Sequence, residues 1–319
     1  MNRYMLFLIA RRTGAGILTL LIVSAVVFFI TSLLPGDAAQ MILGQNATPE
    51  TVAALRAQLG LDQPLLLRYF SWLGGMLQGD FGTSFASHLP VMQLVAQRIP
   101  ATFELAAITT LICVPLALLI GITAAMTRGS LLDRVLVIGT MATVAVPEFL
   151  VATVAVLIFA VKLHWVSAMS FGSPNMDLVS YLKAYALPVL TLCCVLVAQM
   201  ARMTRAAIIN QLDSPWLEMA LLKGVSPLRA VLRHALPNAV GPIANAISLS
   251  LSYLFGGVII IETIFSYPGL ASQLVDAVSN RDLPVVQFCV MLFAGCYLLL
   301  LLLLADVLTI AFNPKWRSA

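Results

Sequence analysis

Glu148 is the acidic side chain whose surroundings point most directly to a function. It follows Pro147 near the middle of an apolar run at about 135–161, where an ionised group is costly unless it faces water or a partner. The proline frees a backbone carbonyl and permits a bend. Two interpretations stay open: Glu148 lines a pore and meets a cationic part of a substrate, or it pairs with a polar group on a companion subunit.

A stripe of small and polar residues follows one face of another apolar run, at about 240–261. Steps of four, three, four and four residues bring the members of the stripe onto that face: Gly241, Asn245, Ser248, Ser252 and Gly256. A stripe of this kind either packs closely against another helix or lines a conduit.

The stretch Glu218–Asn238 gathers charge between two long apolar runs. Its acid and its three lysines and arginines are Glu218, Lys223, Arg229 and Arg233. Gly224 is predicted to end a first short helix, and Ser226–Pro227 has the residue types that start a second one. Pro237 is predicted to stop that second helix. Two short helices at a bend form a docking surface rather than a catalytic site.

Groups for catalysis or metal binding do not come together on any one segment. The three histidines, His88, His164 and His234, are scattered, and the sequence has no Ser/His/Asp set and no spacing that suits zinc. It also lacks the GxxxxGKS/T motif that cradles the phosphates of ATP. The sequence therefore predicts that the chain is not an enzyme by itself, and that it holds no metal and no cofactor of its own.

The composition indicates that these residues sit in a membrane protein. Of the 319 residues, 61% are hydrophobic and 10% are charged, which is more apolar surface than a soluble core can bury. Six apolar runs are near or above the roughly 20 residues that cross the hydrocarbon. They lie at about 14–34, 103–126, 135–161, 187–203, 240–261 and 285–312.

The distribution of basic residues predicts the orientation of these runs. With six crossings, twelve of the eighteen lysines and arginines fall on the side of the N-terminus, although the loops on the other side are longer. Positive charge marks the cytoplasmic side. Both termini and Glu218–Asn238 are therefore predicted to be cytoplasmic. The basic residues are explained by topology, so no nucleic-acid partner is expected.

Residues 35–100 are polar enough to lie outside the bilayer. Thr48–Pro49 and Gly60 are predicted to bound a surface helix. An apolar repeat typical of an interfacial helix follows, at Leu66, Phe70, Leu73 and Leu77. A turn-rich stretch at 79–85 then precedes a short helix predicted to end at Arg98. We therefore divide the chain into 1–34, an extracytoplasmic helical region at 35–100, and a five-helix core at 101–319.

Motifs along essentially the whole chain resemble the peptide/nickel branch of ABC-importer permeases. Glu218, Ala220, Lys223 and Gly224 have the spacing of the EAA loop in those proteins, and Leu236–Pro237 follows at the expected distance. Other matches are PGD at 35–37, LGLDQPL at 59–65, GDFGTS at 79–84, PATFELA at 100–106, IIIETIFSYPGL at 259–270 and RDLPVVQ at 281–287. Each motif is weak alone, but their order and spacing together are specific.

The resemblance implies an all-α polytopic fold of six transmembrane helices, the type I ABC-importer permease fold, in a prokaryotic cytoplasmic membrane. It implies a second homologous permease subunit, two ATPase subunits that bind ATP and Mg, and an extracytoplasmic solute-binding protein. The loop at about 206–238 would couple to the ATPase through Trp216, Glu218, Ala220, Leu221, Lys223 and Gly224. Leu221 stands where the branch usually has arginine, which makes the contact more apolar.

The same resemblance favours a translocation path along Glu148, Asn245, Ser248 and Ser252. Tyr267, Pro268 and Gly269 would belong to an outer gate or to the dock for the binding protein, or to a loop that only connects two spans. The substrates of the branch are peptides, nickel or its chelates, opines and glycans, and the sequence does not choose among them. A stand-alone secondary transporter or channel would leave the basic loop without a role, and an intramembrane enzyme would need clustered catalytic groups.

Overall fold

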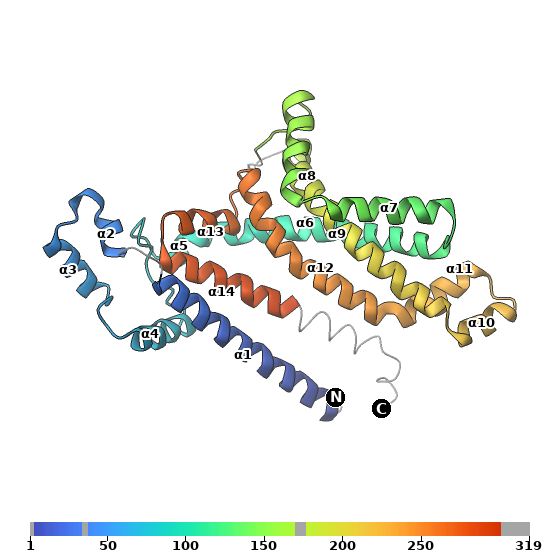
Figure 1. The fold of residues 1–319 in the computed structure, drawn as a ribbon, viewed down its shortest axis with the longest axis horizontal. Coiled ribbons are helices and arrows are strands. Elements are labelled where there is room, and N and C mark those ends of the chain that lie inside the picture. Colours follow the sequence, from blue (N-terminus) through green and yellow to red (C-terminus); the bar gives the residue numbers. More distant parts are fainter. Residues whose placement is uncertain (1–2, 34–37, 170–176, 301–319) are drawn as a thin grey trace. The chain divides into compact units, whose positions relative to one another are not determined.

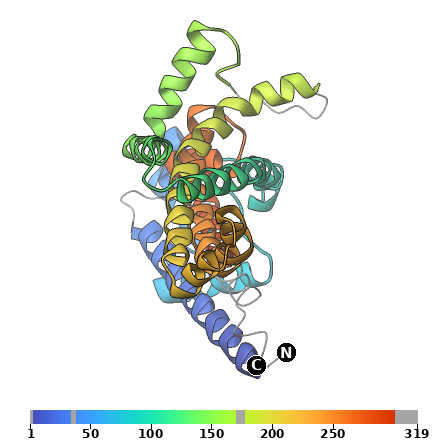
Figure 2. The ribbon, with the colours of Figure 1, turned by 90° about the vertical axis from the view of Figure 1, so that its right-hand side faces the viewer.

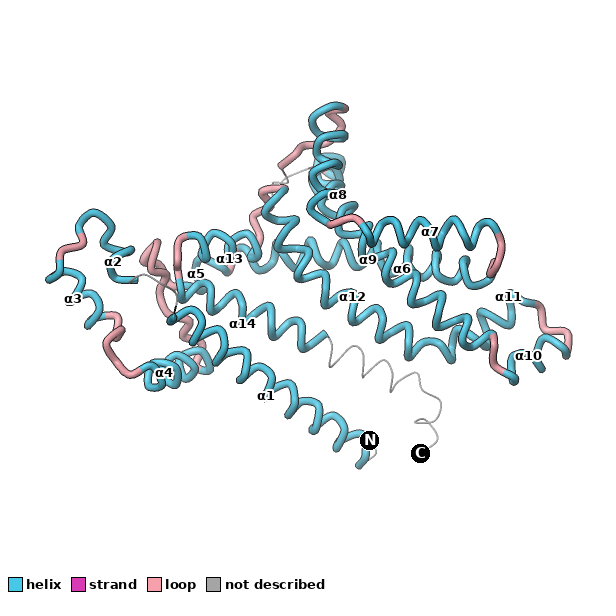
Figure 3. Tube along the Cα trace, in the orientation of Figure 1, coloured by secondary structure: helices cyan, strands magenta, loops and turns pink. Residues whose placement is uncertain are grey.

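A computed structural model describes residues 3–33, 38–169 and 177–300, and every structural statement below concerns that part of the chain. The described residues form helices joined by loops, without a strand (Figure 3). The predicted all-α fold is confirmed. The chain folds as two compact units: unit 1 comprises residues 1–8, 102–268 and 297–319, and unit 2 comprises residues 9–101 and 269–296.

Unit 1 is built from long helices and contains most of the predicted core. Its helices are α6 (Arg98–Met126, in this unit from Thr102), α7 (Leu131–Ala145), α8 (Glu148–Ala155), α9 (Leu178–Leu212), α10 (Pro215–Leu222), α11 (Pro227–Arg229) and α12 (Leu236–Ile264). Two π-helical segments continue α8 and α11: η2 (Val156–Lys162) and η3 (Ala230–Ala235).

Helices α9 and α12 pack along each other and form the centre of unit 1 (Figures 1 and 2). Large apolar side chains such as Leu192 and Met200 on α9 and Ile261 on α12 are fully buried there. Gly121 lets α6 come close as well, because a Cβ at this position would lie 2.7 Å from the carbonyl oxygen of Ala201 on α9. Small residues allow such close backbone approach between apolar helices.

The run predicted at 135–161 is two helices rather than one. Pro147 precedes α8, and α7 and α8–η2 meet at 96° (Figure 1). The predicted bend at the proline is therefore confirmed. Glu148 is the first residue of α8, so it lies at a helix N-terminus in a corner rather than in the middle of a continuous helix.

In addition to α1 (Arg3–Leu33, in this unit from Ile9), unit 2 contains shorter helices. They are α2 (Ala38–Leu43), the 3₁₀ segment η1 (Gly44–Asn46), α3 (Pro49–Gln58), α4 (Leu65–Leu77), α5 (Val91–Val95), α13 (Leu270–Ser279) and α14 (Leu283–Leu299, in this unit to Cys296). Thr48 caps α3 with its side chain, and Gly60 follows with φ +64°, so both predicted ends of that helix are confirmed. The short helix is present, but its predicted end at Arg98 is wrong. Helix α5 stops at Val95, and Arg98 begins α6.

A buried carboxylate holds the turn-rich stretch at 79–85 in unit 2. Asp282 accepts hydrogen bonds from the Ser84 hydroxyl and, at 2.9 Å, from the backbone N–H of Phe85. A buried carboxylate needs hydrogen-bond partners of this kind, because they offset the loss of its water contacts. From the same stretch, the ring of Phe81 packs edge to face with that of Phe288, with centroids 4.6 Å apart.

Four described helices are long and apolar enough to cross a membrane: Ala10–Leu33, Val91–Met126, Leu178–Leu212 and Pro227–Ile264. The bent pair α7 and α8–η2 makes a fifth crossing if it counts as one. The last predicted run, 285–312, extends beyond the described residues, which include α14 as far as Leu299. The count of six therefore stays a prediction.

Candidate functional site

The segment that the sequence predicts to be a cytoplasmic docking surface forms a helical knob, α10 and α11 (Pro215–Arg229), between the ends of α9 and α12 (Figure 1). Gly224 has φ +84°, a left-handed conformation that glycine adopts without strain. The N–H groups of Gly224 and Val225 bond back to the carbonyls of Leu221 and Ala220, at 2.9 and 3.2 Å. The predicted end of the first helix is thus confirmed, and Ser226 and Pro227 begin the second as expected.

The predicted stop at Pro237 is wrong. The chain is helical from Pro227 to Ile264 without a break, through η3 and into α12. In η3 the hydrogen bonds skip an extra residue, and the N–H of Leu236 bonds to the carbonyl of Val231. This wider turn places Pro237 in the first turn of α12, where the missing N–H of a proline costs little.

One face of the knob anchors it to unit 1. Leu217 on α10 is completely buried, and it belongs to a core cluster with Ile208 of α9 and with Ala230 and Val231 of η3. Ala220 packs against the same cluster. The knob is therefore part of the same apolar core as α9 and α12.

The opposite face of the knob is exposed and mostly apolar. Leu222 has 78% of its surface exposed, and Trp216 and Met219 of the same helix are exposed as well. Glu218 and Lys223 flank them, exposed and without an ion pair in the described chain. Leu221, predicted to make the contact apolar, is only just exposed at 39%, so Leu222 contributes more of the apolar surface.

Two ion pairs tie the turn between α6 and α7 to α9, close to the knob. Arg205 donates two hydrogen bonds to the buried Asp133, from Nε at 2.7 Å and from an Nη at 2.8 Å. Arg128 bonds Asp213 at 2.7 Å on the exposed surface. The buried partner of Arg205 lies 72 residues away in the sequence, and no local pattern indicates it.

Glu148 points at α12. If a Cβ were added to Gly257, it would lie 2.7 Å from the Glu148 Oε2 atom, so the carboxylate occupies the space that the glycine leaves open. The glutamate side chain is half-buried, and the positive end of the α8 helix dipole favours a negative charge at this position.

The small and polar stripe on α12 divides into two parts. Ser248 and Ser252 are buried, and their hydroxyls bond to the backbone of their own helix at 2.9 and 2.8 Å. Asn245 is exposed. The two serines have the surroundings of packing residues in this chain, and Asn245 is the stripe residue of the predicted path whose amide is accessible.

A chain of tyrosines lies around Tyr267. Its hydroxyl is 3.0 Å from that of Tyr185, whose ring packs on Tyr181, and Tyr181 donates to Glu104 at 2.6 Å. Tyr267 itself is buried, and burial raises the pKa of its phenol to about 12, so it stays protonated. Gly269 has an extended backbone and directly precedes α13.

Glu262 is a buried acid that was not among the site residues predicted from the sequence. Glu262 on α12 is fully buried and accepts a hydrogen bond of 2.6 Å from Thr102 on α6. Its signal was a glutamate directly after the apolar triplet of the 259–270 motif.

Comparisons with known proteins cover the chain from end to end. The family described as binding-protein-dependent transport system inner membrane component matches residues 117–318, and the N-terminal region of such components matches residues 5–106. A probable peptide ABC transporter permease of Sinorhizobium fredii is 34% identical over 309 residues, 97% of this chain and 98% of that protein. A glutathione transport system permease of Salmonella choleraesuis is 38% identical over 313 residues, 98% and 99% of the two chains. A putative peptide transport system permease of Brucella abortus is 36% identical over 311 residues, 97% and 98% of the two chains.

Proposed function

The chain belongs to the family of inner-membrane components of binding-protein-dependent transport systems, and on that premise we propose that it conducts peptides across the cytoplasmic membrane while partner ATPases drive it. It is a multi-pass permease subunit of an ABC importer. The chain itself does not hydrolyse ATP, and ATP and Mg bind to the partner subunits.

The observation that carries the proposal is the knob of α10 and α11. A single short segment presents exposed apolar side chains, among them Trp216 and Leu222, while Leu217 fixes it in the core of unit 1. Exposed apolar groups of this kind mark a protein interface. An ATPase groove is the partner that matches the cytoplasmic side predicted from the charge distribution.

Peptides are the substrate class that the relatives support. The curated relatives quoted above are named for peptide or glutathione transport, and glutathione is itself a small peptide. Nickel chelates, opines and glycans are the alternatives within the branch. We assign a second homologous permease, two ATPases and an extracytoplasmic binding protein as partners, with both termini in the cytoplasm.

Glu148 and Asn245 are the residues that we place on the path. A carboxylate in the corner between α7 and α8 offers a partner to the protonated amino group of a peptide. Ser248 and Ser252 would shape this path by allowing close helix packing. Tyr267, with Pro268 and Gly269, would form its outer gate.

A co-purification experiment tests the docking. Leu222→Glu puts a charge on an exposed residue and should abolish recovery of the ATPase subunits with the tagged chain. Gly224→Trp should do the same, because its φ of +84° strains any other residue. Gly129→Trp is the matched control, since Gly129 has φ +81° and open space around it in the turn between α6 and α7. Undiminished ATPase recovery with both knob variants would refute the docking proposal and favour a stand-alone transporter.

A transport assay tests the path separately. In Glu148→Gln, uptake of cationic peptides should fall while ATPase recovery stays normal. Uptake of cationic and neutral peptides at the wild-type rate would reduce Glu148 to a structural residue.

A further inference from the structure

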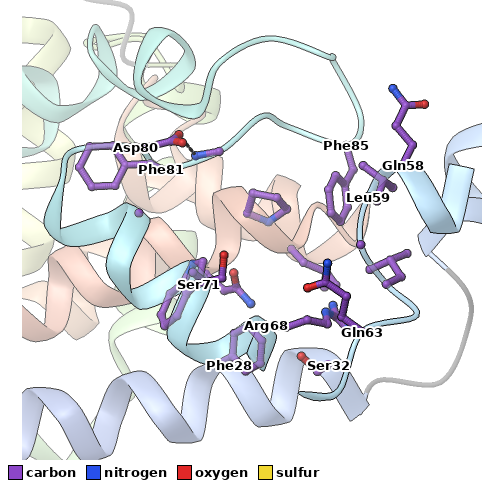
Figure 4. A pocket seen from close by; sticks show the side chains of 18 residues that line it. Phe28, Ser32, Gln58, Leu59, Gln63, Arg68, Ser71, Asp80, Phe81 and Phe85 are labelled. Atoms are coloured by element: carbon purple, nitrogen blue, oxygen red, sulfur yellow. Dashed lines mark hydrogen bonds between the residues drawn. The ribbon is translucent and has the colours of Figure 1, made fainter. Parts of the chain in front are cut away.

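Unit 2 contains a cavity of about 410 Å³ whose wall is both aromatic and polar (Figure 4). Phe28 and Ser32 of α1 line one side, and Arg68 and Ser71 of α4 project into it. Phe85 lines it from the turn-rich stretch at 79–85. Nothing in the importer function proposed above uses this space.

Arg68 is the charged group of this cavity that lacks an opposite charge. Its guanidinium lies 6.0 Å from the ring centroid of Phe28, and within the described chain it forms no ion pair. Asp80 is the one acid among the described lining residues. Its carboxylate accepts from the N–H of Gly82 at 3.0 Å and lies well away from Arg68 in Figure 4.

The surrounding charges make the cavity attractive to an anion. Burial, and then the positive charge of Arg56, lower the pKa of Arg68 from its usual value, but an arginine remains protonated under all physiological conditions. Arg56 has its own partner, Asp62, at 3.0 Å on the exposed surface. An anion would therefore find one free guanidinium, with side-chain amides such as that of Gln63 around it.

The position of the cavity relative to apolar surface indicates where the anion comes from. Helix α4 shows three faces: Tyr69 packs on α1, Arg68 faces the cavity, and a third face exposes Leu66, Phe70 and Leu77, the last to 82%. A helix with one exposed apolar face and a cationic side chain on the opposite, polar side is typical of a segment that lies at the membrane–water interface. That is the depth at which lipid phosphates lie.

We infer that this cavity binds the phosphate of a phospholipid headgroup through Arg68, while the exposed apolar face on the other side of α4 lies against the hydrocarbon of the membrane. A planar guanidinium can donate two parallel hydrogen bonds to one phosphate. The aromatic rings of Phe28 and Trp72 would close the apolar side of the site.

Native mass spectrometry of the assembled transporter tests this inference. Phosphatidylglycerol is titrated into delipidated complexes that carry wild-type chain, Arg68→Gln, Arg68→Lys or Arg56→Gln. Arg68→Gln should weaken the tightest lipid binding by about tenfold, as expected for the loss of a charge-assisted contact. Arg68→Lys should lose less lipid affinity, because lysine keeps the positive charge. Arg56→Gln removes the same charge nearby and should bind as the wild type does.

Two further arms keep the test decisive. If Arg68→Gln fails to assemble, Ser71→Phe fills the cavity without changing a charge and should weaken lipid binding to the same degree. Wild-type lipid affinity in either variant would overturn the inference. The same titrations with inorganic phosphate and with a free dipeptide should show no binding that depends on Arg68. Arg68-dependent binding of either soluble ligand, without lipid binding, would also overturn it.

Discussion

The contact between Glu148 and Gly257 yields a prediction that can be worked out atom by atom. In Gly257→Ala, the new Cβ would lie 2.7 Å from Oε2 of Glu148 and 3.2 Å from a methyl carbon of Leu192. Real Cβ atoms essentially never come within 3.0 Å of a non-bonded heavy atom, so the Glu148 carboxylate must move away from α12.

The magnitude follows from two opposing effects. Overfilling a packed site costs about 1–3 kcal/mol, while alanine in place of glycine within a helix contributes about 0.5–1 kcal/mol. Gly256→Ala isolates the second effect, because Gly256 is exposed and a Cβ there meets nothing within 4 Å. Gly257→Ala should therefore be about 1 kcal/mol less stable than Gly256→Ala, at the low end of this range, because both atoms that the new Cβ meets are the ends of flexible side chains that can turn away.

The free energies of unfolding are measured in mixed detergent micelles for a double-mutant cycle of Gly257→Ala and Glu148→Ala. Removing the carboxylate should relieve most of the clash, with a coupling energy of about 0.5–1 kcal/mol. The close contact with Leu192 is present with or without the Glu148 carboxylate, so it accounts for the destabilisation that remains in the double variant. Equal stability of the Gly256 and Gly257 variants, or additivity within about 0.3 kcal/mol, would refute the geometry.

Two further predictions concern buried polar contacts and are read out by the same unfolding measurement. Asp133→Asn removes the negative charge of the buried ion pair with Arg205 and should lower the free energy of unfolding by about 1–3 kcal/mol; partial exposure of the arginine keeps the loss below that of a fully buried pair. Asp213→Asn breaks an exposed ion pair and should lower it by less than about 1 kcal/mol. Equal losses in the two variants would contradict the role of burial. Thr102→Val takes a donor from the buried Glu262 and should cost about 1–3 kcal/mol. Thr109→Val, on the same helix, should be neutral or stabilising, because the buried Thr109 hydroxyl has no partner in the described chain.

Several ends of helices were predictable because a single residue determines them. Gly224 and Gly60 have φ of +84° and +64°, which glycine adopts without strain, and each follows the end of its helix as expected. Thr48 offers its hydroxyl to the first turn of α3 whatever the rest of the chain does. Such signals are local, so they can be read without knowledge of the packing.

Pro237 shows why a local signal can fail. A proline removes one N–H, but the cost depends on whether the helix around it can rearrange its hydrogen bonds. The π-helical turn η3 makes that rearrangement just before α12. Val231 and Ala235 in that turn are buried, so packing of the turn against the core stabilises a continuous helix that proline alone disfavours.

The sequence by itself determined that this is a helical membrane protein of the importer permease type, and it predicted that the central basic loop is a docking surface. These properties depend on composition, on the length of apolar runs and on the spacing of motifs. Only the tertiary structure decided which polar residues meet. Arg205 bonds to Asp133, Thr102 donates to Glu262, and Glu148 contacts Gly257; the partners are 72, 160 and 109 residues apart in the sequence. Such pairs follow from which helix faces pack together, and the spacing within one segment carries no information about the face of another.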